Sequence, residues 1–178
     1  MTTSIYGGCA CRIFFLLLLT FASVSGIKAE DQVTHVLVPL TAYGVTFYLD
    51  DKEGRSEFHK SLLTAVGTTY LLKAAVDKER PNHSNDDSFP SGHTAGAFMG
   101  AAFIHKRYGW KYAIPGYLAA AYVGHRRVEE DEHHTEDVIA GAAIGILSSF
   151  YFTTSYKGVE IQPYAEGNSY GVLFGTRW

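Results

Sequence analysis

Residues 90–108 read PSGHTAGAFMGAAFIHKRY, and this stretch decides the fold. Beyond its first residues it is rich in Gly, Ala and large apolar residues, and Gly109 supplies a stop at the C-terminal end. We therefore predict a helix over residues 91–108. Gly96 and Gly100 are spaced by four, which permits a second helix to approach closely.

The segments on either side of this stretch also favour helices. Apolar residues at helical spacing mark the helix before it, and Gly141 with Gly145 repeats the small-residue spacing in the last one. The remaining helices are expected at residues 31–49, 58–76, 110–127 and 133–152. Residues 50–54, DDKEG, are expected to form a solvated turn with a glycine stop. The sequence thus predicts an all-α fold, a bundle of about five helices within one domain over residues 30–156.

Residues 157–178 form a tail of a different character. Apolar and aromatic residues are arranged around the turn Glu166-Gly167-Asn168, a pattern more typical of a β-hairpin than of a helix. We expect either a short hairpin packed on the bundle or an extended tail.

Residues 1–29 resemble a secretory signal. Arg12 precedes an apolar run at residues 13–21, and Ala29 offers a small residue at a cleavage point. Ile27 is not the preferred residue for cleavage, so an uncleaved anchor is the alternative. Cleavage would also remove Cys9 and Cys11, the two cysteines of the chain. We expect export to the cell envelope, in the periplasm if the source is bacterial.

The charge of the exported part argues against a nucleic-acid partner. Without Arg12 and Lys28, 13 basic residues face 18 acidic ones, a formal charge of −5. An anion must therefore be captured locally. Residues 32–49 and 138–156 just reach the length that a bilayer requires. We expect a bundle seated on or shallowly within a membrane, with a soluble bundle as the alternative.

Three polar islands interrupt this apolar chain and describe a pocket for phosphate. They are Lys73 with Arg80 and Pro81, then the sequence PSGH at residues 90–93, then Arg127 with His133 and Asp137. Two arginines and a lysine neutralise and hold the nonbridging oxygens of an oxyanion. One histidine attacks the phosphorus and a second protonates the leaving group.

The spacing of His133 and Asp137 predicts their relation. Residues four apart on a helix share one face, so the carboxylate is expected to accept a hydrogen bond from one ring nitrogen of His133. The other nitrogen then remains free as a nucleophile, and the carboxylate stabilises the positive charge of a phosphohistidine.

His93 lies at the expected start of a helix, where unpaired backbone N–H groups and the helix dipole favour an anion. Gly92 lets the backbone approach a phosphate closely, and the hydroxyl of Ser91 adds a further donor. We therefore expect all three residues in the pocket.

The pattern K-x6-R-P, P-S-G-H and R-x5-H-x3-D over residues 73–137 resembles that of the type-2 phosphatidic acid phosphatase and vanadium haloperoxidase superfamily. The resemblance implies an all-helical core, an active site between helices, and phosphate-ester hydrolysis without a metal or other cofactor. It also implies that His93 acts first as general acid and then as the base that activates water.

One position departs from this pattern, because Arg126 stands where the superfamily usually has serine. The acidic run at residues 129–132 is expected to stay in water at a helix N-terminus or to pair with Arg126. His134 is expected to face outward or to support the site. No complete set of metal ligands is evident. Solvated side chains are expected at Lys78, Lys106, Arg107 and Lys111.

The leading hypothesis is a metal-independent phosphatase that hydrolyses a phosphomonoester or pyrophosphate of a lipid through a phosphohistidine. The motifs contact only the phosphate, so phosphatidic acid, phosphatidylglycerophosphate, polyprenyl pyrophosphate and lipid A phosphate are all open. Selection among them is expected from residues 82–89, the first two helices and the tail. The alternatives are a soluble acid phosphatase acting on small phosphate esters, a vanadate-dependent haloperoxidase and an inactive envelope protein.

Overall fold

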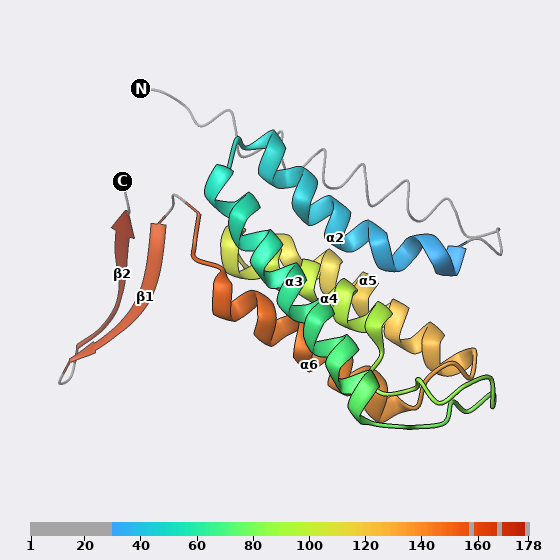
Figure 1. Ribbon diagram of the computed structural model, residues 1–178. Helices are drawn as coiled ribbons and strands as arrows, with labels where there is room; N and C mark the ends of the chain where they lie inside the picture. The colour runs from blue at the N-terminus through green and yellow to red at the C-terminus, as the bar shows by residue number, and fades with distance from the viewer. Residues whose placement is uncertain (1–29, 157–158, 167–168, 177–178) are drawn as a thin grey trace.

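The computed structural model describes residues 30–156, 159–166 and 169–176, with side chains described over residues 35–156. The predicted signal, residues 1–29, lies outside this part. The predicted all-α fold is confirmed. The described residues form five helices, which are α2 (Glu30–Tyr48), α3 (Lys52–Ala75), α4 (Gly92–Tyr108), α5 (Trp110–Glu129) and α6 (Thr135–Phe152). Two strands, β1 (Val159–Glu166) and β2 (Ser169–Thr176), pair antiparallel beside the bundle (Figure 1).

Helix α4 is the centre of the bundle and contacts each of the other four helices. Small residues of α4 and of its neighbour α6 allow these helices to pack closely. A Cβ added at Gly100 would lie 2.7 Å from the Pro39 Cα of α2, and one at Gly145 of α6 would lie 2.3 Å from the carbonyl oxygen of Ala95. Both distances are too short for a real side chain, so these glycines permit the close approach that their spacing predicts. Gly96 faces open space and takes no part in this packing.

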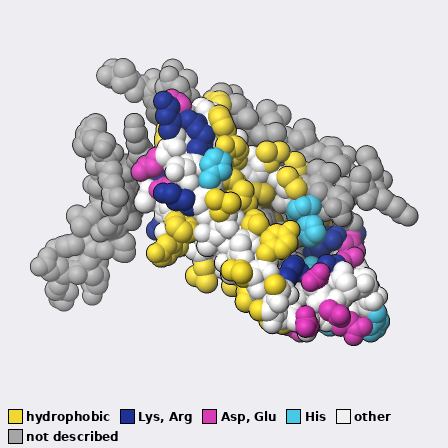
Figure 2. Space-filling model, in the orientation of Figure 1, with side chains coloured by type: hydrophobic (Ala, Val, Ile, Leu, Met, Phe, Trp, Pro, Cys, Tyr) yellow, Lys and Arg dark blue, Asp and Glu magenta, His cyan; other side chains and the backbone are white. Residues whose placement is uncertain are grey.

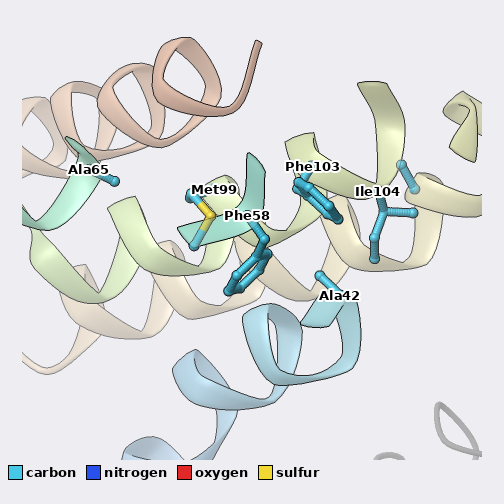
Figure 3. Close-up of a cluster of buried hydrophobic side chains, with 7 residues drawn as sticks. Ala42, Phe58, Ala65, Met99, Phe103 and Ile104 are labelled. Carbon is cyan, nitrogen blue, oxygen red and sulfur yellow. The ribbon is translucent and has the colours of Figure 1, made fainter. Parts of the chain in front are cut away.

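A cluster of buried apolar side chains joins four helices at α4 (Figure 3). Met99, Phe103 and Ile104 of α4 are almost fully buried, and Phe58 of α3 meets Phe103 edge to face at 5.2 Å between ring centroids. Burying a side chain of this size stabilises the fold by roughly 1.5–3 kcal/mol. Ala42 of α2 fills the remaining space beside them.

Helix α3 begins six residues before the predicted start. Asp51 caps it, accepting a hydrogen bond from the backbone N–H of Gly54 at 2.9 Å, so the charged stretch forms the first turn of the helix. The predicted solvated turn at residues 50–54 is therefore wrong, because Asp51 and Gly54 are buried. Local composition resembled a turn, but tertiary contacts supply partners for these charges.

The main partner of Asp51 is Arg107, for which a solvated side chain was predicted wrongly. The guanidinium is 2% exposed and donates to both carboxylate oxygens of Asp51, at 2.7 and 2.6 Å. It also donates to Glu57 at 3.1 Å and to the Thr154 carbonyl at 3.1 Å. We call these four residues, with Tyr108, the arginine cluster. Burial disfavours the charge of Arg107, but these carboxylates outweigh it and raise its pKa.

The two ends of the bundle differ in composition. The arginine cluster lies where α3 begins and α4 ends, while the long connection of residues 76–91 and the short one of residues 130–134 meet at the opposite end, called here the loop end (Figure 1). In the space-filling view, basic, acidic and histidine side chains gather at the loop end, and apolar side chains cover much of the middle (Figure 2). Among the described residues, no helix is both long enough and apolar enough to cross a bilayer.

Candidate active site

The three polar motifs meet at the loop end. Lys73 is in the last turn of α3, His93 is in the first turn of α4, and Arg127 is in the last turn of α5. The Asn82 N–H donates to the Asp131 carbonyl at 3.0 Å and joins the two connections, and the Ser91 N–H donates to the Asp137 carbonyl at 3.0 Å and joins the first connection to α6. Residues far apart in sequence are thus held in one place.

His133 lies in the short connection of residues 130–134 and is buried, with 3% of its side chain exposed. Its Nδ1 lies 2.6 Å from the carbonyl oxygen of Ser88. Because a carbonyl oxygen only accepts, Nδ1 must carry the proton, and in the neutral ring the lone pair is then on Nε2. Burial first, and then the charges of Arg80 and Lys73, lower the pKa of His133 to about 4. The ring is therefore neutral at pH 7, as a nucleophile requires.

The predicted direct hydrogen bond between His133 and Asp137 is absent. Helix α6 begins only at Thr135, so the two residues do not share a helix face, and the His133 Nδ1 is 4.0 Å from the nearer carboxylate oxygen. Asp137 instead accepts from the Ser88 hydroxyl at 2.5 Å and from the His134 N–H at 3.0 Å. Asp137 and His133 thus both contact Ser88, whose hydroxyl donates to the carboxylate and whose carbonyl accepts from the ring.

Lys78, predicted to be solvated, is the cation that accompanies this buried carboxylate. Its Nζ lies 2.6 Å from Asp137 and 2.8 Å from Glu136. Burial disfavours the charge of Asp137, but the hydrogen bonds from Lys78, Ser88 and His134 lower its pKa. Lys78 lies between the two basic residues of the first motif, but only the fold reveals its partner. A fully buried carboxylate needs a nearby cation, and this need is the signal that could have indicated a partner such as Lys78.

His93 occupies the first turn of α4, as predicted, and its ring is partly buried. Burial first, and then the charges of His35, Arg127, His133 and Arg80, lower its pKa to about 4. Gly92 makes no close packing contact, since a Cβ there would meet the protein only at 3.6 Å. The protein interior thus does not require a glycine at this position.

Ser91, predicted as a side-chain donor to phosphate, lies at the N-cap of α4. It is fully buried, and its hydroxyl is 2.9 Å from that of Thr94 inside the bundle. Its backbone N–H is also engaged, by the carbonyl of Asp137. Ser91 therefore joins the start of α4 to α6.

The basic residues of the motifs surround both imidazoles. Arg80 and Lys73 lower the pKa of His133, and Arg80 and Arg127 lower that of His93. Two further hydrogen bonds position this group. The Lys73 Nζ donates to the Asp87 carbonyl at 2.5 Å, and the Arg80 Nε donates to Asn85 at 2.8 Å. Three cations and two neutral rings therefore lie within reach of one another's charges, as expected for the predicted phosphate pocket, and such an arrangement can bind and attack an anion.

Two residues of the acidic run, which was expected to stay in water or to pair with Arg126, form ion pairs with arginines of the motifs. Glu132 forms an ion pair with Arg80, and Glu130 forms one with Arg127. Glu130 also pairs with Arg126 at 2.7 Å, and Glu129 pairs with Arg126 at 3.2 Å. The departure from the usual serine thus places a second arginine among the same carboxylates. Within the described residues, no three His, Cys, Asp or Glu side chains come together as a potential metal site.

The motifs that this all-helical bundle brings together can be compared with those of known proteins. The model of the PAP2 superfamily matches residues 73–160, which contain all three motifs. The chain is 30% identical over 173 residues to the lipid A 4'-phosphatase of Helicobacter pylori, covering 86% of this chain and 87% of that protein. The chain belongs to the PAP2 superfamily, and the resemblance seen in the sequence is confirmed.

The chain is also similar to a second lipid A phosphatase and to a solved structure. The lipid A 1-phosphatase of Porphyromonas gingivalis is 40% identical over 140 residues, which are 72% of this chain but only 31% of that protein. The crystal structure of Aquifex aeolicus LpxE aligns with a TM-score of 0.48 and 22% identity, covering 79% of this chain and 92% of that chain.

Proposed function

We propose that the protein is a metal-independent lipid phosphatase of the cell envelope that works through a phosphohistidine at Nε2 of His133. One observation carries this proposal. The His133 ring is buried, held by its Nδ1 on the Ser88 carbonyl, and surrounded by the cations of the motifs. A neutral imidazole with its lone pair on Nε2, beside a cationic anion site, is poised to attack phosphorus.

The first step forms the phosphoenzyme. Nε2 of His133 bonds to phosphorus as the bond to the leaving oxygen breaks, and His93 donates a proton to that oxygen. Lys73, Arg80 and Arg127 neutralise the nonbridging oxygens. His93 has a pKa of about 4 without an anion beside it. A phosphate dianion entering the pocket raises that pKa, because it favours the charged ring, and so prepares the acid.

The second step releases phosphate. His93, now neutral, takes a proton from water as the water oxygen bonds to phosphorus. The bond between phosphorus and Nε2 breaks, and its electron pair returns to the His133 ring. Inorganic phosphate leaves, and both imidazoles regain their starting states. No step calls for a metal.

A lipid substrate is supported by the outer surface and by the names of the relatives. Several large apolar side chains are highly exposed on three helices: Leu63, Tyr70, Leu71, Leu118, Leu147 and Tyr151. Their exposed fractions range from 68% for Leu118 and Leu147 to 82% for Tyr151. Apolar surface on this scale favours contact with a membrane. Two relatives are lipid A phosphatases, so a lipid A phosphate ester is the first substrate to test.

The test is a phosphate-release assay with lipid A, phosphatidic acid and a soluble phosphomonoester, with and without a chelator. We expect release from a lipid in the presence of chelator and its loss in His133→Ala. A radiolabelled, acid-labile phosphoenzyme should accumulate in His93→Ala with p-nitrophenyl phosphate, because its leaving group needs little proton donation while water is no longer activated. Full activity of His133→Ala would rule out the proposed nucleophile. Cleavage of the soluble ester alone would instead indicate a nonspecific phosphatase.

A further inference from the structure

Helix α2 brings one more histidine to the site. The start of this helix lies at the loop end of the bundle (Figure 1), outside residues 73–160 and outside all three motifs. The ring of His35 meets the ring of His93 edge to face, with centroids 4.0 Å apart and planes at 82°. His35 thus touches the side chain that would exchange protons with the leaving group and with water.

The groups around His93 come from four parts of the chain. They are His35 from α2, Arg127 from α5, His133 ahead of α6, and Arg80 from the connection after α3. The two arginines stay charged at all relevant pH values. His35 is the one histidine in this set that no motif explains, and a histidine changes its charge near physiological pH.

We propose that His35 is a positioning residue for His93. The ring of His35 holds the ring of His93 toward the leaving group, and a charged His35 opposes protonation of His93. This inference rests on the proposed function, because it assigns proton transfer to His93. The edge-to-face contact restricts rotation of the His93 ring. Two imidazoles in contact do not readily carry a proton each, so their titrations are coupled.

The direction of the charge effect follows from the surroundings of His93. Burial lowers its pKa most, and the charge of His35 is the next cause. Removing that charge raises the pKa of His93. A general acid loses activity as pH rises through its pKa, so the alkaline limb of kcat/KM moves to higher pH in the variant.

Two variants separate ring contact from charge. His35→Phe keeps a flat ring and removes the charge, while His35→Asn removes both. Phenyl phosphate and p-nitrophenyl phosphate serve as probes, because the better leaving group of the second needs less proton donation. We expect His35→Asn to lose about tenfold in kcat on phenyl phosphate, part of the roughly hundredfold or more that a positioned acid supplies. It should lose little on p-nitrophenyl phosphate, and His35→Phe should recover most of the loss.

The matched control is His59→Asn, a histidine of α3 that contacts Tyr43 of α2 away from the pocket. It should change neither rate. Thermal melting of all variants checks the fold. Equal losses of His35→Asn on both esters would overturn the inference, because they would indicate a role in binding phosphate or in folding.

A second readout does not depend on activity. NMR titration of labelled histidine, with His93→Ala used for assignment, follows the His93 ring directly. His93 should titrate at higher pH in His35→Asn than in the wild type, and at the same pH in His59→Asn. An unchanged His93 titration would overturn the inference. If the wild type cleaves no phosphate ester, the proposed function fails while this titration still tests the contact.

Discussion

Both ends of the bundle hold arginines and carboxylates, but the two ends balance them differently. In the arginine cluster, Arg107 is buried, and the buried carboxylates of Asp51 and Glu57 match it. At the loop end, three cations and two imidazoles share the pocket, and the carboxylates opposite the arginines remain partly exposed. Removing one partner of such a buried, compensated group leaves the other charge uncompensated and destabilises the fold. Cations with exchangeable partners remain able to bind a ligand.

The largest expected effect is on stability, at the compensated end. Replacing Arg107 by Met leaves two buried carboxylates without their cation, which costs about 3–5 kcal/mol in the free energy of unfolding. Urea unfolding measures this loss. Lys106→Met is the matched control, because Lys106 is next to Arg107 in the sequence but its side chain is exposed. This variant should change the free energy of unfolding by less than about 0.5 kcal/mol. A small effect of Arg107→Met would remove the contrast between the two ends.

The second effect is on activity, at the loop end. Replacing Arg80 by Ala should lower kcat/KM for phosphate release about a hundredfold, or about 3 kcal/mol, because one preorganised donor to the phosphate is lost. The free energy of unfolding should change far less than in Arg107→Met, since the partner Glu132 is partly exposed and regains water. Equal loss of stability in the two variants would show that both arginines are structural.

The sequence predicted that the three polar motifs come together. It did not predict the side-chain contacts that depend on the exact residue at which a helix begins or ends. Periodicity and small-residue spacing are local properties, so the five helices and the close approach at Gly100 and Gly145 followed from them. The relation of His133 to Asp137 did not follow from local properties, because α6 begins after His133 and the hydrogen-bond partner of the His133 ring is a backbone carbonyl. Every residue has a backbone carbonyl, so the sequence does not show which one accepts this hydrogen bond.

Charged residues show the same limit. Arg107, Lys78 and Glu132 have ordinary neighbours in the sequence, and composition alone favours solvent for each. Their partners are 50 or more positions away, at separations of 56 residues for Arg107 with Asp51 and 59 for Lys78 with Asp137. Only the packing of helices and connections brings these pairs together.

The third effect concerns the link from Lys78 to His133. Lys78→Met removes a charged hydrogen bond from Asp137, so Ser88 and the His133 ring lose support, and activity should fall about tenfold at pH 7. Lys78 is among the causes that lower the pKa of Asp137. That carboxylate contributes stability above its unfolded pKa, and the contribution is lost as pH falls through its folded pKa. The variant raises the folded pKa, so it should lose stability at a higher pH than the wild type during acid titration. An unchanged acid transition and rate would contradict this link.

The smallest expected effect tests whether the carboxylates at the loop end compete with substrate. Glu132→Gln removes the negative charge opposite Arg80, so an anion no longer displaces an ion pair when it binds. Such a partly exposed pair is worth roughly 0.2–1 kcal/mol, so inhibition by inorganic phosphate or vanadate should tighten by about two- to fivefold. Glu129→Gln is the matched control, because Glu129 pairs with Arg126 and not with Arg80. Weaker inhibition in Glu132→Gln would mean that this carboxylate positions Arg80 for the phosphate, and the loop end would then resemble the arginine cluster more closely.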